Sequence, residues 1–275
     1  MSKATETYRE ELIAVNELEI DRRVQRDGLN KVKVRKIVRE YNPGALGVVT
    51  VSYRKDRSLI IIDGWHRVEA TRIKTDNVGE LKCHVFGRET HLTLAEEAQM
   101  FLDLNTTTQP PVLDKFRVST ETEGEVGDAA RDIQDLVGAY GFKISNVAAN
   151  GNINAVKVVV RMYDLSRKIE AEPNLVHVTC LVIARAWGND RYGTQGSIFE
   201  AIARIFAEYG SRIDLDRFID TVKMYDGGPQ SLIAAGTALA ALRKGKVSMA
   251  IAELLVDGYN KGKRTGLLEQ WRKRT

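Results

Sequence analysis

The sequence has few of the residues that build disulfide frameworks, zinc sites and membrane spans. Its 275 residues include two cysteines, Cys83 and Cys180, and four histidines that lack the paired spacing of a zinc site. Two thiols do not make a disulfide framework, so we expect a protein of the reducing cytoplasm. No apolar run approaches the length of a bilayer span and the first residues are polar, so secretion and membrane insertion are not expected.

Familiar hydrolase motifs are missing as well. There is no Ser-His-Asp order, no His-Glu-x-x-His and no zinc-finger spacing, and no glycine-rich turn carries the Lys-Ser/Thr pair of a Walker loop. The net charge of +4 and the pI near 8.9 permit a nucleic-acid partner without requiring one. The length is sufficient for a sizeable core and for two domains.

The most informative stretch is residues 59–73, LIIIDGWHRVEATRI. Four aliphatic residues predict a short buried strand, Asp63 and Gly64 break it, and a helix with Val68 and Ile73 on one side follows. Such a turn presents backbone N–H groups at a helix N-terminus, where an anion is favoured. Gly64 would let a ligand approach the backbone closely.

Two interpretations of this turn stay open from its chemistry alone. In the first, the turn is a phosphate cradle in which His66 and Arg67 add hydrogen-bond donors beside Gly64. In the second, it is an ordinary strand-to-helix turn whose His66 and Arg67 are solvated or bonded to nearby carbonyl groups. One glycine and two polar side chains do not decide between them.

The sequence Asp-Gly-Trp-His-Arg at residues 63–67, followed by Glu-Ala, resembles the signature turn of the ParB/sulfiredoxin superfamily. The run DRRVQR at residues 21–26 resembles the first conserved box of that superfamily, and FLDLNTTTQP at residues 101–110 resembles the third. The three segments occur in the family order and cover less than half of the chain. The resemblance implies a ParB/sulfiredoxin-like fold and a turn that binds nucleotide phosphates.

Differences at the turn separate the activities of this superfamily. Sulfiredoxin chemistry requires a cysteine directly after the turn glycine, where this chain has Trp65, so thiol-dependent phosphorylation is excluded at this site. The ParB nucleotide triphosphatases carry Gly-Glu-Arg-Arg, of which Gly64 and Arg67 are shared. The free-amino-acid and polyol kinases of this fold carry Asp-Gly-His-Thr-Arg, which Asp63, Gly64 and Arg67 match, with His66 in place of Thr.

The resemblance also implies roles for particular residues. Those implied in nucleotide and phosphate binding are Gln25, Arg26, Gly64, Trp65, His66, Arg67 and Asn105. Asn105 is in addition the implied metal ligand, which would hold Mg²⁺ with ATP or CTP. The candidate catalytic groups are Asp63, His66 and Glu17. A kinase needs a carboxylate general base near the acceptor hydroxyl, a role that Asp63 or Glu17 could serve.

Pro110 and Pro111 mark the expected division of an α+β chain. A ParB/sulfiredoxin-like domain with a mixed sheet and helices is expected at residues 10–110, and an all-helical domain at 111–275. The first part predicts an initial strand within residues 11–18, a hairpin of strands at 48–53 and 59–62, a strand at 82–86, and helices at 29–41 and 93–104. The second part predicts seven helices, at residues 128–140, 154–169, 175–187, 197–209, 214–225, 229–244 and 248–259.

Two basic segments are candidates for nucleic-acid contact: the outer face of the first expected helix, and the C-terminal tail. Their candidate residues are Lys33, Lys36, Arg264, Arg272 and Lys273. Solvated surface and a frayed terminus explain the same charges. Contacts to a phosphate backbone would be salt-sensitive and independent of base sequence.

Three functions remain as hypotheses. The first is a ParB-like nucleotide-binding protein that acts on or with DNA, either as a slow ATP or CTP hydrolase or as a nucleotide-gated switch. The second is a kinase or an accessory enzyme of phage DNA-base modification. The third is a non-catalytic phage protein that binds a host target. Nuclease activity is not favoured, because the turn supplies only Asp63 and Glu69 as carboxylates. We expect nucleotide and DNA as partners, no membrane, and a homo-oligomer or a partner protein.

Overall fold

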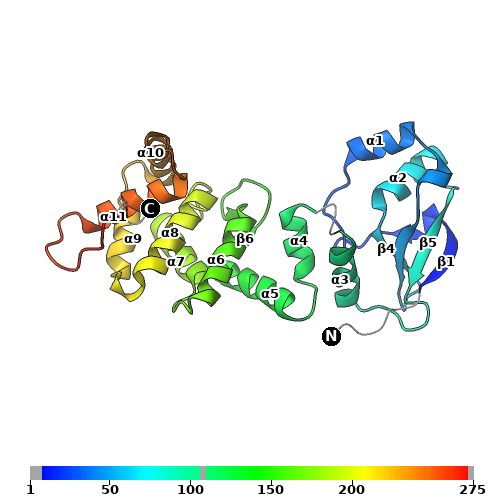
Figure 1. Cartoon of the computed structure of the whole chain (residues 1–275), viewed down its shortest axis with the longest axis horizontal. Coiled ribbons are helices and arrows are strands. Elements are labelled where there is room, and N and C mark those ends of the chain that lie inside the picture. Colours follow the sequence, from blue (N-terminus) through cyan, green and yellow to red (C-terminus); the bar gives the residue numbers. More distant parts are fainter. Residues whose placement is uncertain (1–7, 106–109, 272–275) are drawn as a thin grey trace. The chain divides into compact units, whose positions relative to one another are not determined.

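The computed structural model describes residues 8–105 and 110–271, and the chain divides into two compact units, residues 1–130 and 131–275 (Figure 1). The predicted α+β class is confirmed, since the described residues form a mixed sheet and eleven α-helices. The ParB/sulfiredoxin-like arrangement and the domain boundary at residues 110 and 111 stay predictions. Among these described residues, no helix combines the length and the apolar character that crossing a bilayer requires.

The first unit is built on a five-stranded sheet with the strand order β1-β5-β3-β4-β2. The strands are β1 (Arg9–Ala14), β2 (Leu18–Glu19), β3 (Val49–Tyr53), β4 (Leu59–Asp63) and β5 (Glu80–Phe86). β3 and β4 are antiparallel, which confirms the predicted hairpin, and β1 is antiparallel to β5. β2 is parallel to β4 and β5 is parallel to β3, so the sheet is mixed.

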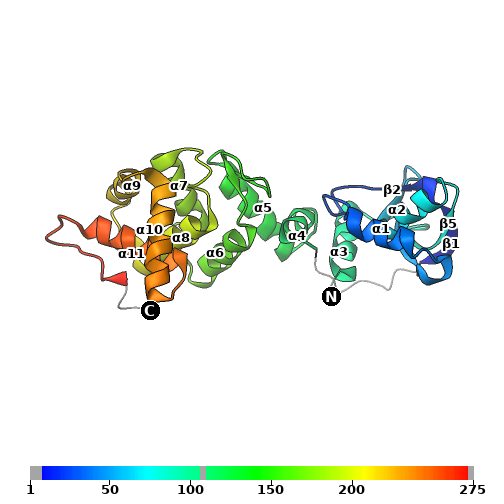
Figure 2. The same cartoon turned by 90° about the horizontal axis from the view of Figure 1, so that it is seen from above.

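β4 is buried on both faces, and this fixes the position of the turn that follows it. Ile61 packs with Val68 of α2 (Trp65–Lys74) on one face of the sheet. Ile60 and Ile62 pack with Phe101 of α3 (Leu94–Leu104) on the other. Successive side chains of a strand point to opposite faces, so a continuous aliphatic run suits a strand covered on both sides. α1 (Lys31–Arg39) packs along α2, as both views show (Figures 1 and 2).

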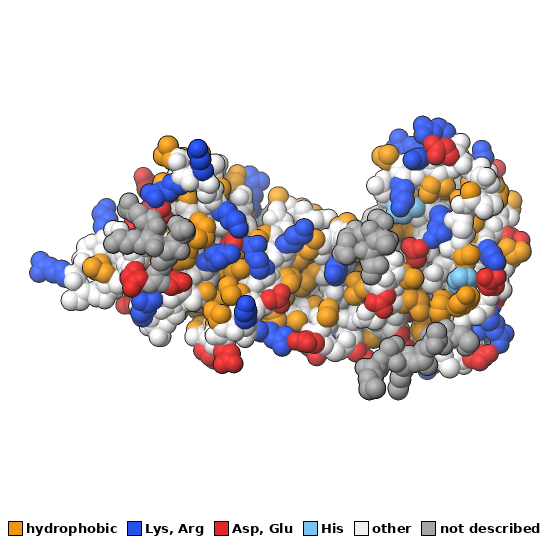
Figure 3. Space-filling view, in the orientation of Figure 1, with side chains coloured by type: hydrophobic (Ala, Val, Ile, Leu, Met, Phe, Trp, Pro, Cys, Tyr) orange, Lys and Arg blue, Asp and Glu red, His pale blue; other side chains and the backbone are white. Residues whose placement is uncertain are grey.

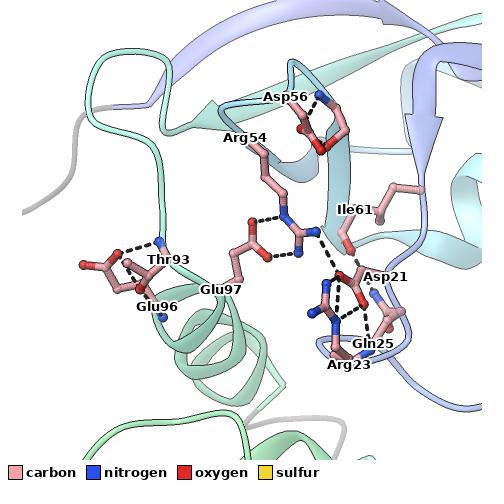
Figure 4. A network of polar contacts seen from close by, with 10 residues as sticks. Asp21, Arg23, Gln25, Arg54, Asp56, Ile61, Thr93, Glu96 and Glu97 are labelled. Atoms are coloured by element: carbon pink, nitrogen blue, oxygen red, sulfur yellow. Dashed lines mark hydrogen bonds and ion pairs between the residues drawn. The ribbon is translucent and has the colours of Figure 1, made fainter.

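A network of ion pairs links the β3–β4 hairpin, α3 and the loop before α1 (Figure 4). Arg54 Nε donates to Glu97 Oε1 at 2.9 Å, and a second Arg54 nitrogen bonds the other carboxylate oxygen. Arg54 Nη1 donates to Asp21 Oδ2 at 2.9 Å, and Arg23 Nε donates to Asp21 Oδ1 at 3.0 Å. These bonds hold the pKa of Asp21 well below its usual value, and the bonds from Arg23 have the largest effect. The network anchors the segment that leads to Gln25.

A helix that the sequence did not predict, α4 (Val112–Ser119), also belongs to the first unit. The N–H of Asp27 donates to Asp114 Oδ1 at 3.0 Å, and the Arg117 guanidinium donates to the carbonyl oxygen of Gln25. Val118 is buried in the same core cluster as Phe101 of α3. Residues beyond the two prolines therefore pack against the sheet-bearing unit.

The second unit is helical, and each of the seven helices predicted beyond the two prolines has a counterpart in the chain, the first of them crossing the division at residue 130. They are α5 (Glu125–Gly138), α6 (Val156–Lys168), α7 (Leu175–Trp187), α8 (Gly196–Tyr209), α9 (Leu215–Lys223), α10 (Gly228–Arg243) and α11 (Val247–Asn260). α8 is the central element, since α6, α7 and α11 all pack against it. One small feature was not predicted: the parallel two-residue strands β6 (Lys143–Ile144) and β7 (Asn152–Ile153).

The variant Arg54→Met tests the ion-pair network. The Glu97 side chain is 0% exposed, so removing its guanidinium partner leaves a buried carboxylate without a counter-charge. Breaking a buried pair in this way costs about 3–5 kcal/mol. We expect a loss of about 3 kcal/mol in the free energy of unfolding by urea, since Arg54 itself is 20% exposed.

Arg9→Met provides the control for this variant. Arg9 pairs with Glu89 at 2.7 Å, but both side chains are largely exposed, and such surface pairs contribute little to stability. The control should therefore unfold at close to the native urea concentration. Equal losses in Arg54→Met and Arg9→Met would contradict the role assigned to the network.

Candidate functional site

A cavity of about 490 Å³ opens beside the turn between β4 and α2. Its lining residues are Gln25, Arg26, Lys33, Ile37, Glu40, Asn42, Ala45, Leu46, Asp63, Gly64, Trp65, His66, Arg67, Leu104 and Asn105. All of them belong to the first unit. The volume is that of a small-molecule site. Every residue that the sequence implied in phosphate binding lies in this lining, although the three segments are far apart in the chain.

The turn itself depends on Gly64. This residue is the N-cap of α2 and has a φ of 103°, a left-handed conformation that an L-side chain rarely adopts. A Cβ at this position would lie 3.0 Å from Nη2 of Arg67 and 3.0 Å from Cγ2 of Val49. As a glycine, this residue has no side chain to cap α2. The positively polarised end of the helix is thus bordered by backbone rather than by a capping side chain.

Arg67 is engaged by the protein on three sides. Its Nη1 donates to the carbonyl oxygens of Val48 at 2.7 Å and Leu46 at 3.1 Å. Its Nη2 donates to Asp63 Oδ2 at 2.8 Å. Arg67 therefore clamps the segment before β3 to the turn, as in the interpretation in which its guanidinium bonds nearby carbonyl groups. The same contact places the positive guanidinium beside the carboxylate of Asp63, one of the candidate catalytic groups.

His66 connects the starts of two helices. Its Nε2 accepts the backbone N–H of Asn30 at 3.2 Å, and Asn30 is the N-cap of α1. Burial lowers the pKa of His66 below its ordinary value of 6.5, and the positive charges of Lys33 and Arg26 lower it further, against a smaller opposite effect of Asp63. The ring is therefore neutral near pH 7, with Nε2 as acceptor and the proton on Nδ1.

The third segment closes the cavity through Asn105 at the end of α3. Arg26 Nη2 donates to Asn105 Oδ1 at 2.8 Å, and Asn105 Nδ2 donates to the carbonyl oxygen of Phe101 at 2.8 Å. Gln25 is almost fully buried and donates to the carbonyl oxygens of Ile61 and Ile62 in β4. The loop that carries Arg26 is thereby fixed against both the sheet and α3.

The described lining offers few free oxygen ligands for a magnesium ion. Mg²⁺ requires oxygen ligands in a near-octahedral arrangement. The Asn105 oxygen, the implied ligand, already accepts from the Arg26 guanidinium, whose charge would oppose a cation there. The lining contains two carboxylates: Asp63, which is paired with Arg67, and Glu40. Among the described residues no group of three His, Cys, Asp or Glu side chains could hold a metal ion.

Other predicted residues lie outside the cavity. Glu17 is exposed at the end of a 3₁₀ turn and is not in the lining. Lys36 is exposed on α1, one turn beyond the lining residue Lys33, and Arg264 is exposed in the second unit. Arg272 and Lys273 lie outside the described residues, as do residues 106–109 of the third segment.

Cys83 is a core thiol, as the alternation of its strand predicted. It is fully buried within β5, in the core cluster that packs on α2. Burial raises its pKa to about 11, and the charge of Glu11 acts in the same direction. A thiol held in this protonated form is a poor nucleophile.

Sequence reasoning missed part of the lining. The missed residues are Ile37, Glu40, Asn42, Ala45, Leu46 and Leu104. The missed partner of His66, Asn30, stands directly before the predicted basic helix, where an asparagine is a typical N-cap. That signal locates the helix start but not the contact with His66, which depends on α1 packing along α2.

These features define an α+β protein whose first unit carries a polar cavity with a small excess of cationic side chains at a strand-turn-helix junction. The chain belongs to a family of unknown function (DUF6551), whose model matches residues 20–266. The match includes all three cavity segments and most of the helical unit. No curated protein matches the chain.

Gly64→Ala should destabilise the protein. An L-residue held in the left-handed region costs about 1–2 kcal/mol, and the added Cβ would press against Arg67 and Val49. The measurement is the free energy of unfolding by urea. Gly28→Ala is the control, because no atom lies within 4 Å of its Cβ and its φ is not in the left-handed region. Equal stabilities for the two variants would rule out the strain assigned to Gly64.

The lowered pKa of His66 predicts a pH dependence of stability. Below pH 6.5 the unfolded chain binds a proton at this residue more readily than the folded protein does, so the free energy of unfolding rises with pH in that window. The stabilisation is complete above about pH 6.5 and is lost as the pH falls through the folded-state pKa. His66→Gln should remove this part of the dependence. A His66 pKa at or above 6.5 by NMR titration would contradict the assignment.

Proposed function

We propose that the cavity binds the phosphates of a nucleotide, and that the protein is a cytoplasmic nucleotide-binding protein that acts on or with DNA. One observation carries the proposal: Arg26, Lys33 and His66 come from three separate segments and line a single cavity at the start of α2. Positive side chains beside the positively polarised N-terminus of a helix favour an anion, and the backbone N–H groups there are hydrogen-bond donors. The resemblance of the three segments to the ParB/sulfiredoxin superfamily supports the same ligand.

The cavity offers different chemistry to the two ends of a nucleotide. Arg26 and Lys33 supply positive charge for the phosphates, and the neutral His66 has an Nδ1–H donor. Ile37, Leu46 and Trp65 supply apolar lining, which suits a ribose or a base. Arg67 would act indirectly, because its guanidinium already holds Asp63 and the carbonyl oxygens of residues 46 and 48.

The positions of the carboxylates favour a nucleotide-gated switch with slow turnover over a kinase. A general base must lie within hydrogen-bond reach of the proton that it removes. Asp63 is bonded to Arg67 at 2.8 Å, and Glu17 does not line the cavity. Neither of these two predicted bases is therefore poised to activate an acceptor hydroxyl, and Glu40, the other lining carboxylate, is paired with Arg39 at 2.9 Å. Binding without rapid chemistry is the function that this arrangement supports best.

The DNA part of the proposal draws on α1, whose sequence KVKVRKIVR contains five basic residues. Lys and Arg side chains gather at this helix in the space-filling view (Figure 3). The same helix lines the cavity through Lys33 and Ile37. A DNA segment on α1 would lie next to the bound nucleotide, so occupancy of the cavity could change DNA affinity.

A comparison of Lys33→Gln with Lys36→Gln tests nucleotide binding. Both lysines are exposed on α1, but only Lys33 lines the cavity. A ligand that binds only the folded protein raises the melting temperature. We expect ATP or CTP to raise that of the native chain and of Lys36→Gln, and to bind Lys33→Gln about tenfold more weakly, because a charge-assisted hydrogen bond is lost.

The possible outcomes separate the hypotheses. Loss of the shift in Lys33→Gln alone supports phosphate binding in this cavity. No shift for ATP, CTP or GTP with the native chain would overturn the proposal and leave the non-catalytic binding protein. Transfer of phosphate from the nucleotide to an added hydroxyl compound would favour the kinase instead.

A further inference from the structure

The second unit carries a basic loop at residues 261–266, Lys-Gly-Lys-Arg-Thr-Gly, directly after α11. The loop projects from the helices of this unit (Figure 1), and Lys or Arg side chains lie at its tip in the space-filling view (Figure 3). Lys261 and Arg264 are exposed. The lining residues of the proposed nucleotide cavity all belong to the first unit.

The base of the basic loop is closed by a pair of hydrogen bonds. Asn260 Nδ2 donates to the carbonyl oxygen of Leu268 at 2.8 Å, and the N–H of Leu268 donates to Asn260 Oδ1 at 2.8 Å. Leu268 and Trp271 are buried, and Tyr209 Oη donates to the carbonyl oxygen of Glu269 at 2.6 Å. Both ends of the loop are therefore anchored in the core of the helical unit.

Arg217 and Tyr259 hold the loop from within. The Arg217 guanidinium donates to the carbonyl oxygens of Tyr259 at 3.1 Å and Lys261 at 2.9 Å. Tyr259 is fully buried, and Lys263 Nζ lies 3.1 Å from its hydroxyl oxygen and 4.3 Å from its ring centroid. These contacts fix the backbone and one ammonium group of a segment whose charges repel each other.

Two further cations of this loop are left for an external partner. Within residues 8–105 and 110–271, neither Lys261 nor Arg264 has a carboxylate partner. Gly262 and Gly266 have φ of 77° and 62°, and no atom lies within 4 Å of a Cβ placed at Gly262. The backbone beside the cations is therefore open to close approach.

The chemistry of the loop selects a phosphate backbone as the partner. Protein interfaces are anchored by buried aromatic and apolar side chains, and residues 261–266 contain none. Contacts to nucleic-acid phosphates need only cations and backbone N–H groups. We propose that the basic loop contacts the phosphate backbone of duplex DNA without reading base sequence. The inference rests on the DNA part of the proposed function and is independent of the nucleotide cavity.

The test is fluorescence anisotropy of the full chain with a short labelled duplex of arbitrary sequence, across a series of salt concentrations. The loop variant is Lys261→Gln with Arg264→Gln. The control, Lys157→Gln with Lys168→Gln, removes the same charge from exposed positions of α6. The loop variant should bind at least roughly tenfold more weakly, and the slope of log affinity against log salt should fall by about two. The control should bind like the native chain.

Several results would overturn the inference. Equal losses in the loop variant and the control would mean that only net charge matters. A loss in Lys33→Gln but not in the loop variant would place the DNA contact on α1 and leave the proposed function intact. Absence of duplex binding would overturn the DNA contact itself, whereas nucleotide-induced melting shifts would still report on the cavity. Binding of labelled polyglutamate through the same two residues, as tight as duplex binding, would identify an acidic protein as the partner.

Discussion

The cavity depends on the position of one guanidinium group, that of Arg67. It joins Asp63 at the end of β4 to the carbonyl oxygens of Leu46 and Val48, which lie between α1 and β3. Gly64 makes this possible, because a Cβ there would lie 3.0 Å from the same guanidinium. The glycine and the arginine of the turn thus act together. Gly64 leaves space for the guanidinium, and Arg67 fixes the segment before β3 against the turn. Both residues are shared with the ParB turn that the sequence resembles.

A second charge network supports the cavity from the other face of the sheet. Arg54, Glu97 and Asp21 connect the hairpin, α3 and the loop that delivers Arg26 to the lining. Burying charges is costly, and well-packed apolar residues often give similar stability. What an ion-pair network adds is a defined geometry, which an anion site requires because its donors must converge within hydrogen-bond distance.

Much of the fold could be predicted from local pattern. The apolar run of β4 and the spacing of α7 locate these elements, and α7 has the predicted bounds, Leu175–Trp187. Other parts of both units could not be predicted in this way. In the first unit, Asp114 of α4 accepts the Asp27 N–H and Arg117 donates to the Gln25 carbonyl oxygen, both residues far away in the sequence. In the second unit, the two-residue strands β6 and β7 are too short to produce a periodic signal.

The candidate site, like the fold, could be predicted from the sequence only in part. Segment resemblance grouped Arg26, His66 and Asn105, and all three line one cavity. It did not reveal that the Arg67 guanidinium donates to backbone carbonyl oxygens, or that the Asn105 side-chain oxygen accepts from the Arg26 guanidinium. Those facts depend on which groups meet after folding, and they move the expected anion contacts toward Arg26, Lys33 and His66.

The most direct test of the account is a backbone amide NMR titration of the full chain with ATP and CTP. We predict saturable shifts at the amides of Gly64, Trp65 and His66, accompanied by shifts at Arg26 and Lys33. Shifts confined to the helical unit, or none at millimolar nucleotide, would contradict a phosphate site at this turn.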